Sequence, residues 1–230
     1  MGTVAEHLFL FSMIALSGSL LWVHEAEAQR GLDLENDTLT QSVFIHPPLD
    51  VSGEGLDLTT SEHEYREQLR LADQLGRDFI VEKLNGDGIS RPYPPETNGR
   101  ENEDWYGWRR DVLAPFEATV ARVLKPDTVN TPGTMNRKAQ PGGIVFEDTS
   151  ENITVLYGHV REISVEEGET VRPGEVVAKV GNNGNSRNPH VHIGAWEGDA
   201  SKLGAKSGTP LQIQVDLNAE ERFGTEEDTE

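Results

Sequence analysis

The sequence contains no cysteine among its 230 residues, so disulfides, thiolate metal sites and cysteine nucleophiles are excluded. Any metal must therefore be held by His, Asp or Glu. Basic residues are also scarce: 20 Lys and Arg stand against 40 Asp and Glu, which gives a formal charge of −20. Nucleic-acid partners require a basic surface, so this composition argues against them. A His-Glu-x-x-His helix is absent too, which excludes a helical zincin site.

The N-terminal segment lacks charge over the apolar run Leu8–Val23, and Ala26-Glu27-Ala28 places small residues where a signal peptidase reads the chain. We therefore expect residues 1–28 to be a signal peptide cleaved before Gln29, with export to the periplasm or the cell exterior. The n-region contains Glu6 and no Lys or Arg. The alternative is an uncleaved anchor, and membrane contact is expected only in that case.

The rest of the chain divides by composition into three further parts. Residues 29–60 read as a linker and N-terminal extension, residues 61–217 as the folded domain, and residues 218–230 as an acidic disordered tail. The pattern Ser61-Glu62-His63-Glu64 resembles a capping box, and apolar residues follow it at helical spacing, which predicts one short helix over residues 62–75.

Short apolar runs separated by turn residues predict a mainly β fold. We expect antiparallel strands that form a small sandwich or barrel-like core with hairpin insertions. A long surface loop is predicted over residues 89–104. The expected strands are residues 43–45, 78–81, 112–115, 118–124, 143–147, 153–159, 170–171, 176–180 and 191–195.

The pair His190 and His192 lies in the most informative part of the chain. Side chains at i and i+2 of a strand share one face, so the two imidazoles are expected to lie side by side. A zinc hydrolase needs such a pair, one as a metal ligand and one beside the reacting water. The alternative is two polar residues on the solvated face of an antiparallel strand.

The surrounding sequence resembles the lysostaphin-like (LytM-type) zinc metalloendopeptidases. The matching features are Tyr157-Gly158-His159, a glycine-punctuated hairpin over residues 165–180, and the run Gly181-Asn182-Asn183-Gly184-Asn185-Ser186-Arg187-Asn188-Pro189-His190-Val191-His192. The resemblance implies that His192 is a zinc ligand. It also implies that His159 and His190 are catalytic residues that flank the water and the developing oxyanion. Which of these two is the base stays open.

The upstream half of the metal site departs from the family pattern, a compact His-x-x-x-Asp. Gln74 stands where that histidine would precede Asp78. Resemblance to the long-looped branch of the family implies that Asp78 and His63 are the remaining zinc ligands. Asp111 is the alternative aspartate. His46 is an alternative histidine, because it precedes an aspartate at the His-x-x-x-Asp spacing, although within a proline-rich segment.

The function implied by this resemblance is an exported zinc-dependent endopeptidase that uses metal-activated water. Its substrate would be peptide of the bacterial cell wall, with peptidoglycan cross-links as the expected target. The alternative is a degenerate, non-catalytic member that acts as a cell-wall binding or regulatory module. The broken upstream motif favours that alternative, as does Ala118, where the family usually has glycine. The exact bond cleaved and the oligomeric state stay open.

Overall fold

The computed structural model describes residues 41–53, 55–65 and 69–216. The expected signal peptide, the first part of the linker and the acidic tail lie outside these residues, and the domain boundaries stay predictions. None of the helices within these ranges is long and apolar enough to span a membrane.

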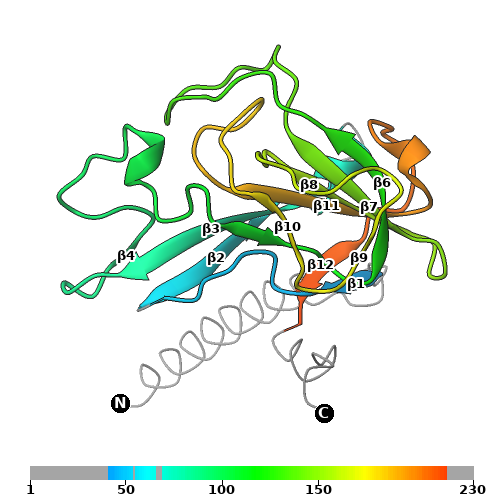
Figure 1. The fold of residues 1–230 in the computed structure, drawn as a ribbon, viewed down its shortest axis with the longest axis horizontal. Helices are drawn as coiled ribbons and strands as arrows, with labels where there is room; N and C mark the ends of the chain where they lie inside the picture. The colour runs from blue at the N-terminus through cyan, green and yellow to red at the C-terminus, as the bar shows by residue number, and fades with distance from the viewer. Residues whose placement is uncertain (1–40, 54, 66–68, 217–230) are drawn as a thin grey trace, which may run out of the picture. The chain divides into compact units, whose positions relative to one another are not determined.

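Eight strands form the main sheet, in the order β2-β3-β11-β8-β7-β6-β9, and β4 pairs with the far end of β3 (Figure 1). Every pairing in this sheet is antiparallel. The strands are β2 (Leu56–Glu62), β3 (Arg77–Leu84), β4 (Ser90–Arg91), β6 (Ala118–Leu124), β7 (Gly143–Asp148), β8 (Ile153–Gly158), β9 (Thr170–Val171) and β11 (Val191–Glu197).

Two small sheets and three 3₁₀ turns complete the described chain. The antiparallel pair is β5 (Asp111–Leu113) with β10 (Val176–Lys179), and the parallel pair is β1 (Ser42–Ile45) with β12 (Gln212–Val215). The turns are η1 (Leu71–Asp73), η2 (Asn102–Asp104) and η3 (Ala200–Lys202). The predicted mainly β, antiparallel fold is confirmed. The main sheet ends at β2 and β9 and does not close into a barrel.

Strand β11 is buried on both faces. Val191, Ile193 and Ala195 belong to the main hydrophobic core, whereas Trp196 packs in a second cluster with Leu71. His192 alternates with the core residues, so it lies on the Trp196 face of the strand. The sheet thus presents His192 on a rigid, well-packed element.

The predicted helix over residues 62–75 is wrong in the described part of that segment. Residues 56–62 form strand β2, which pairs with β3 along its whole length, and only η1 is helical, as a single 3₁₀ turn. The capping-box pattern is a local signal, and a helix this short is marginal without tertiary support. Pairing of β2 with β3 satisfies the backbone over seven residues and overrides that signal.

Two further strands, β4 and β12, were not predicted. The segment Gln212-Ile213-Gln214-Val215 does alternate polar and apolar residues, which is a strand signal. Its partner is β1, about 170 residues away along the chain. Strand β4 has only two residues, too few for a recognisable period.

Packing of η1 against β11 leaves no room for a side chain at Gly194. A Cβ there would overlap the backbone of Ala72, including its carbonyl oxygen. Gly194→Ala should therefore displace η1 and lower the free energy of unfolding by about 1–3 kcal/mol, the usual cost of overpacking. Gly86→Ala is the matched control, since a Cβ there meets nothing within 4 Å. Urea unfolding midpoints measure both, and equal midpoints would contradict the packing argument.

Candidate metal centre

The register of three neighbouring strands brings His63, Asp78 and His192 together. Asp78 on β3 lies directly opposite His192 on β11. On its other side Asp78 lies opposite Ser61 of β2, and His63 continues that pairing through a hydrogen bond from its backbone N–H to the carbonyl of Gly76 at 2.7 Å. Because alternate residues share a face, His63 lies diagonally across from Asp78 on the same side of the sheet.

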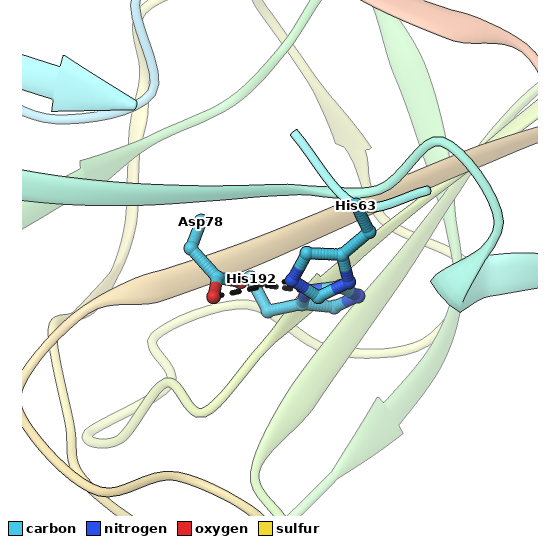
Figure 2. Close-up of side chains that lie close together, drawn as sticks. All are labelled: His63, Asp78 and His192. Atoms are coloured by element: carbon cyan, nitrogen blue, oxygen red, sulfur yellow. Dashed lines mark hydrogen bonds and ion pairs between the residues drawn. The ribbon is translucent and has the colours of Figure 1, made fainter. Parts of the chain in front are cut away.

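The three side chains converge on one point (Figure 2). Nδ1 of His192 lies 2.9 Å from Oδ1 of Asp78, and Nε2 of His63 lies 3.2 Å from Oδ2. One possible ligand atom from each residue lies within 4.8 Å of those of the other two. His192 is buried, while His63 and Asp78 are half-buried, so solvent reaches one side of the cluster.

Two acceptors face the nitrogens of the His192 ring, a backbone carbonyl at Nε2 and the Asp78 carboxylate at Nδ1. Nε2 of His192 lies 3.2 Å from the carbonyl oxygen of Ala72, and a carbonyl can only accept a hydrogen bond. When Nε2 donates to this carbonyl, Nδ1 of the neutral ring presents its lone pair to the Asp78 carboxylate; when Nδ1 carries the proton, it donates to Asp78. Two lone pairs 2.9 Å apart are compatible only with a proton or a cation between them. This donor set, with two imidazoles and one carboxylate, fits a zinc ion.

Asp78 is the electrostatic centre of the cluster. Its burial acts to raise the pKa of its carboxyl, but hydrogen bonds from His192 and His63 outweigh burial. The pKa of Asp78 therefore lies well below its usual range. The hydrogen bond to Asp78 in turn raises the pKa of His63. Asp78 is thus a carboxylate at neutral pH, ready to balance positive charge.

His159 and His190 lie beside this cluster on its buried side. The ring centroids of His159 and His190 are 4.8 Å apart, and Nε2 of His190 is 3.6 Å from Oδ1 of Asp78. His190 and His192 both reach Asp78, which places them on one face, as expected from their spacing. Burial lowers the pKa of both His159 and His190, so both rings are neutral near pH 7.

The expectation that His159 lies on a strand is wrong. β8 ends at Gly158, and His159 follows it with a positive φ of 64°. Non-glycine residues rarely adopt this conformation. Asn183 holds this conformation in place. The side-chain NH₂ group of Asn183 donates to the carbonyls of His159 and Val160, and the backbone carbonyl of Asn183 accepts from Nδ1 of His159 at 2.9 Å.

The alternative upstream residues lie elsewhere. Asp111 pairs with Lys179 across the small β5–β10 sheet. The His46 ring contacts the Pro47 carbonyl and lies against Gly174. The Gln74 amide donates to the carbonyls of Leu69 and Lys206, away from the cluster.

Three supporting groups were not predicted from the sequence. The Ala72 carbonyl is a backbone atom and leaves no residue-type signal. Asp73, whose carboxylate lies 3.5 Å from Nε2 of His192, belongs to η1 and carries no motif of its own. Gly76 leaves room for the His192 ring, since a Cβ there would lie 2.8 Å from its Cε1. A search for glycines just before the ligand aspartate could have found the last of these.

Residues 109–203 match the model of peptidase family M23. The match covers less than half of the chain and supports the resemblance of this segment to the lysostaphin-like (LytM-type) peptidases. The matched segment contains His159, His190 and His192, whereas His63 and Asp78 precede it. No curated protein matches the chain.

Several solved structures resemble the chain at low identity. A crystal structure of a SpoIIIAH and SpoIIQ complex aligns at 19% identity and a TM-score of 0.41, covering 73% of this chain and 95% of that one. The M23 metalloprotease pseudoalterin aligns at 17% identity and a TM-score of 0.39, covering 67% and 71%. The catalytic domain of lysostaphin from Staphylococcus simulans aligns at 21% identity and a TM-score of 0.25, covering 48% and 78%.

Burial of His159 makes the metal-free protein less stable in acid. Its folded pKa lies below the ordinary value of 6.5, so below pH 6.5 the unfolded chain binds a proton that the folded chain does not. The free energy of unfolding should therefore fall as pH drops through this window, by up to about 1.4 kcal/mol per pH unit for this one group. His159→Gln should show a shallower fall in chelator-treated protein unfolded by urea. Above about pH 7.5 the two curves should run parallel; equal slopes below pH 6.5 would contradict the prediction.

Proposed function

We propose that the protein is an exported zinc-dependent endopeptidase that hydrolyses peptide bonds of the bacterial cell wall. The observation that carries the proposal is the convergence of His63, Asp78 and His192 beside two further imidazoles, the buried His190 and the half-buried His159. A peptidase needs both parts, a place for a Lewis acid and groups that move protons next to it.

His63, Asp78 and His192 would hold the zinc ion through imidazole nitrogen and carboxylate oxygen. Bound zinc would supply a Lewis acid that polarises the scissile carbonyl and lowers the pKa of a coordinated water. The chain's own contribution is to orient the ligands: with zinc bound, the Ala72 carbonyl would accept from Nε2 of His192 and direct the Nδ1 lone pair to the metal.

His159 and His190 are the residues proposed to handle protons. Nδ1 of each ring contacts a backbone carbonyl, that of Asn183 for His159 and that of Asn188 for His190. Both Nδ1 atoms therefore carry the ring proton, and both Nε2 atoms present a lone pair. Either ring can take a proton from the attacking water and, once charged, donate to the oxyanion or the leaving amine.

The substrate and location come from the sequence and the family. Cell-wall peptide, with peptidoglycan cross-links as the expected target, follows from resemblance to the lysostaphin-like peptidases. Export follows from the apolar N-terminal segment and its Ala-x-Ala site. The acidic composition gives no support to a nucleic-acid substrate.

Substitution of His159 and of His192 should separate catalysis from metal binding. His159→Ala should retain about one zinc per chain, because the other three groups hold the metal, yet hydrolysis of cell-wall peptides should fall about 10²–10⁴-fold. His192→Ala should lose zinc and activity together. Zinc content by atomic spectroscopy and turnover of purified peptidoglycan fragments are measured on the same samples.

A wild type that binds zinc but cleaves no cell-wall peptide would favour the non-catalytic alternative. In that case both variants should bind wall fragments as the wild type does, unless a histidine lies in the interface. A His159→Ala variant that loses its zinc would instead contradict the division of roles.

The upstream ligand is tested by a matched pair of histidine variants. His63→Ala should lower zinc affinity by at least about 10-fold, because it removes one of three ligands. His46→Ala, which removes a histidine that mimics the compact spacing but lies outside the cluster, should leave affinity unchanged. Competition with a chromophoric zinc chelator measures both. Equal affinities for the two variants would overturn the assignment of His63.

A further inference from the structure

A buried polar network lies behind His190 and is not explained by metal binding. It consists of three asparagines and one serine. Their exposed fractions are 8% for Asn102, 6% for Asn130, 0% for Asn182 and 1% for Ser186. Asparagine is usually exposed, and a buried amide is unfavourable unless its hydrogen bonds are made. The network therefore needs a reason for its position.

Its bonds link three loops that are far apart in the sequence. The Asn102 amide donates to the Asn130 carbonyl at 2.8 Å, and the Asn182 amide donates to Oδ1 of Asn102 at 2.9 Å. The backbone N–H of Asn130 donates to the Asn182 carbonyl at 2.7 Å, which closes the ring. Asn130 also donates from its side chain to the carbonyls of Gly184 and Ser186.

The direction of these bonds is fixed by the backbone. The Asn130 carbonyl can only accept, so the NH₂ group of Asn102 faces it and Oδ1 of Asn102 faces Asn182. Asn182 must then present its NH₂ group to Asn102, aided by a longer bond of 3.3 Å to the same Asn130 carbonyl. This leaves Oδ1 of Asn182 turned toward Ser186.

Ser186 connects the network to His190. Its Oγ lies 2.9 Å from Oδ1 of Asn182 and 3.2 Å from Nδ1 of His190. The hydroxyl has one proton; when that proton goes to Asn182, an oxygen lone pair faces Nδ1 of His190. Nδ1 then donates both to Ser186 and to the Asn188 carbonyl at 2.8 Å.

We propose that Asn102 is a positioning residue for His190. By fixing the orientation of the Asn182 amide, it keeps Ser186 as an acceptor and holds the ring proton of His190 on Nδ1. Nε2 of His190 is then free on the side that faces Asp78. The proposal rests on the endopeptidase function for its kinetic consequence, but the state of the ring does not depend on that function.

Without Asn102 the Asn182 amide loses its main acceptor and can turn. Its NH₂ group can then face Ser186, whose hydroxyl proton no longer goes to Asn182 and can be donated to the Asn188 carbonyl or to a lone pair on Nδ1 of His190. The Nε2–H form of His190 becomes more populated, and the free base is lost in that fraction of molecules. The expected kinetic effect is a fall in kcat with little change in KM.

The test compares Asn102→Ala with Asn98→Ala, an exposed asparagine of the same loop that bonds only locally, to the Arg100 N–H. In the full-length metal-free protein labelled with ¹⁵N-histidine, NMR at neutral pH should give Nδ1–H for His190 in wild type and Asn98→Ala. Asn102→Ala should give a mixture of tautomers. In the zinc-loaded protein, Asn102→Ala should lower kcat about 10-fold or more with zinc content unchanged, within the range found for outer-shell partners.

A double substitution distinguishes this route from a general loss of packing. Ser186→Ala should reproduce the kcat loss and Ser186→Thr, which keeps the hydroxyl, should largely restore it. Asn102→Ala combined with Ser186→Ala should cost no more than the larger single loss, because both act through one path. Multiplied losses, or an unchanged His190 tautomer in Asn102→Ala, would overturn the proposal. Absence of hydrolysis in the wild type, with the tautomer change still observed, would count against the endopeptidase function alone.

Discussion

The Asp78 carboxylate is the group on which the arrangement of this protein depends. It lies in the middle of three paired strands, with β2 on one side and β11 on the other. Strand pairing fixes the register of β2 and β11 relative to β3, because a slip of one residue would turn Asp78 to the opposite face of the sheet. His63 and His192 therefore meet Asp78 because of backbone register, and the candidate metal centre is built on the sheet itself.

Backbone carbonyls determine the chemistry of the imidazoles around Asp78. Carbonyls of Ala72, Asn183 and Asn188 each accept from one ring nitrogen of His192, His159 and His190. Carbonyl oxygens cannot change from acceptor to donor, whereas water can, so each contact favours a proton on the ring nitrogen that faces the carbonyl. At His159 and His190 that nitrogen is Nδ1, with Ser186 as a second acceptor at His190, and Nε2 of both rings then presents a lone pair. At His192 the carbonyl faces Nε2, and Nδ1 is the nitrogen directed at Asp78.

Much of the fold and the downstream half of the site could be predicted from the sequence, because the signals there are local. Alternating apolar residues and glycine turns mark the strands from β5 to β11, and His190 and His192 share a face through strand period alone. The upstream half was predicted only through family resemblance. The local pattern around His63 favours a helix, and pairing of β2 with β3 decides otherwise. Such pairing, like that of β1 with β12, depends on contacts between segments that are separated along the chain, so a short stretch of sequence does not reveal it.

The replacement of the compact histidine by Gln74 is consistent with this geometry. A histidine at position 74 would approach Asp78 along its own chain, but the Gln74 side chain is buried and holds two carbonyls that anchor the segment carrying η1. That anchoring positions the Ala72 carbonyl against His192, and the overlap that a side chain at Gly194 would cause indicates how closely η1 packs. In the proposed metal centre His63, just after the end of β2, would be the third ligand instead. The segment before Asp78 thus supplies a support and no imidazole: the end of β2 would supply the second imidazole of the cluster, and the Ala72 carbonyl is the acceptor that orients His192.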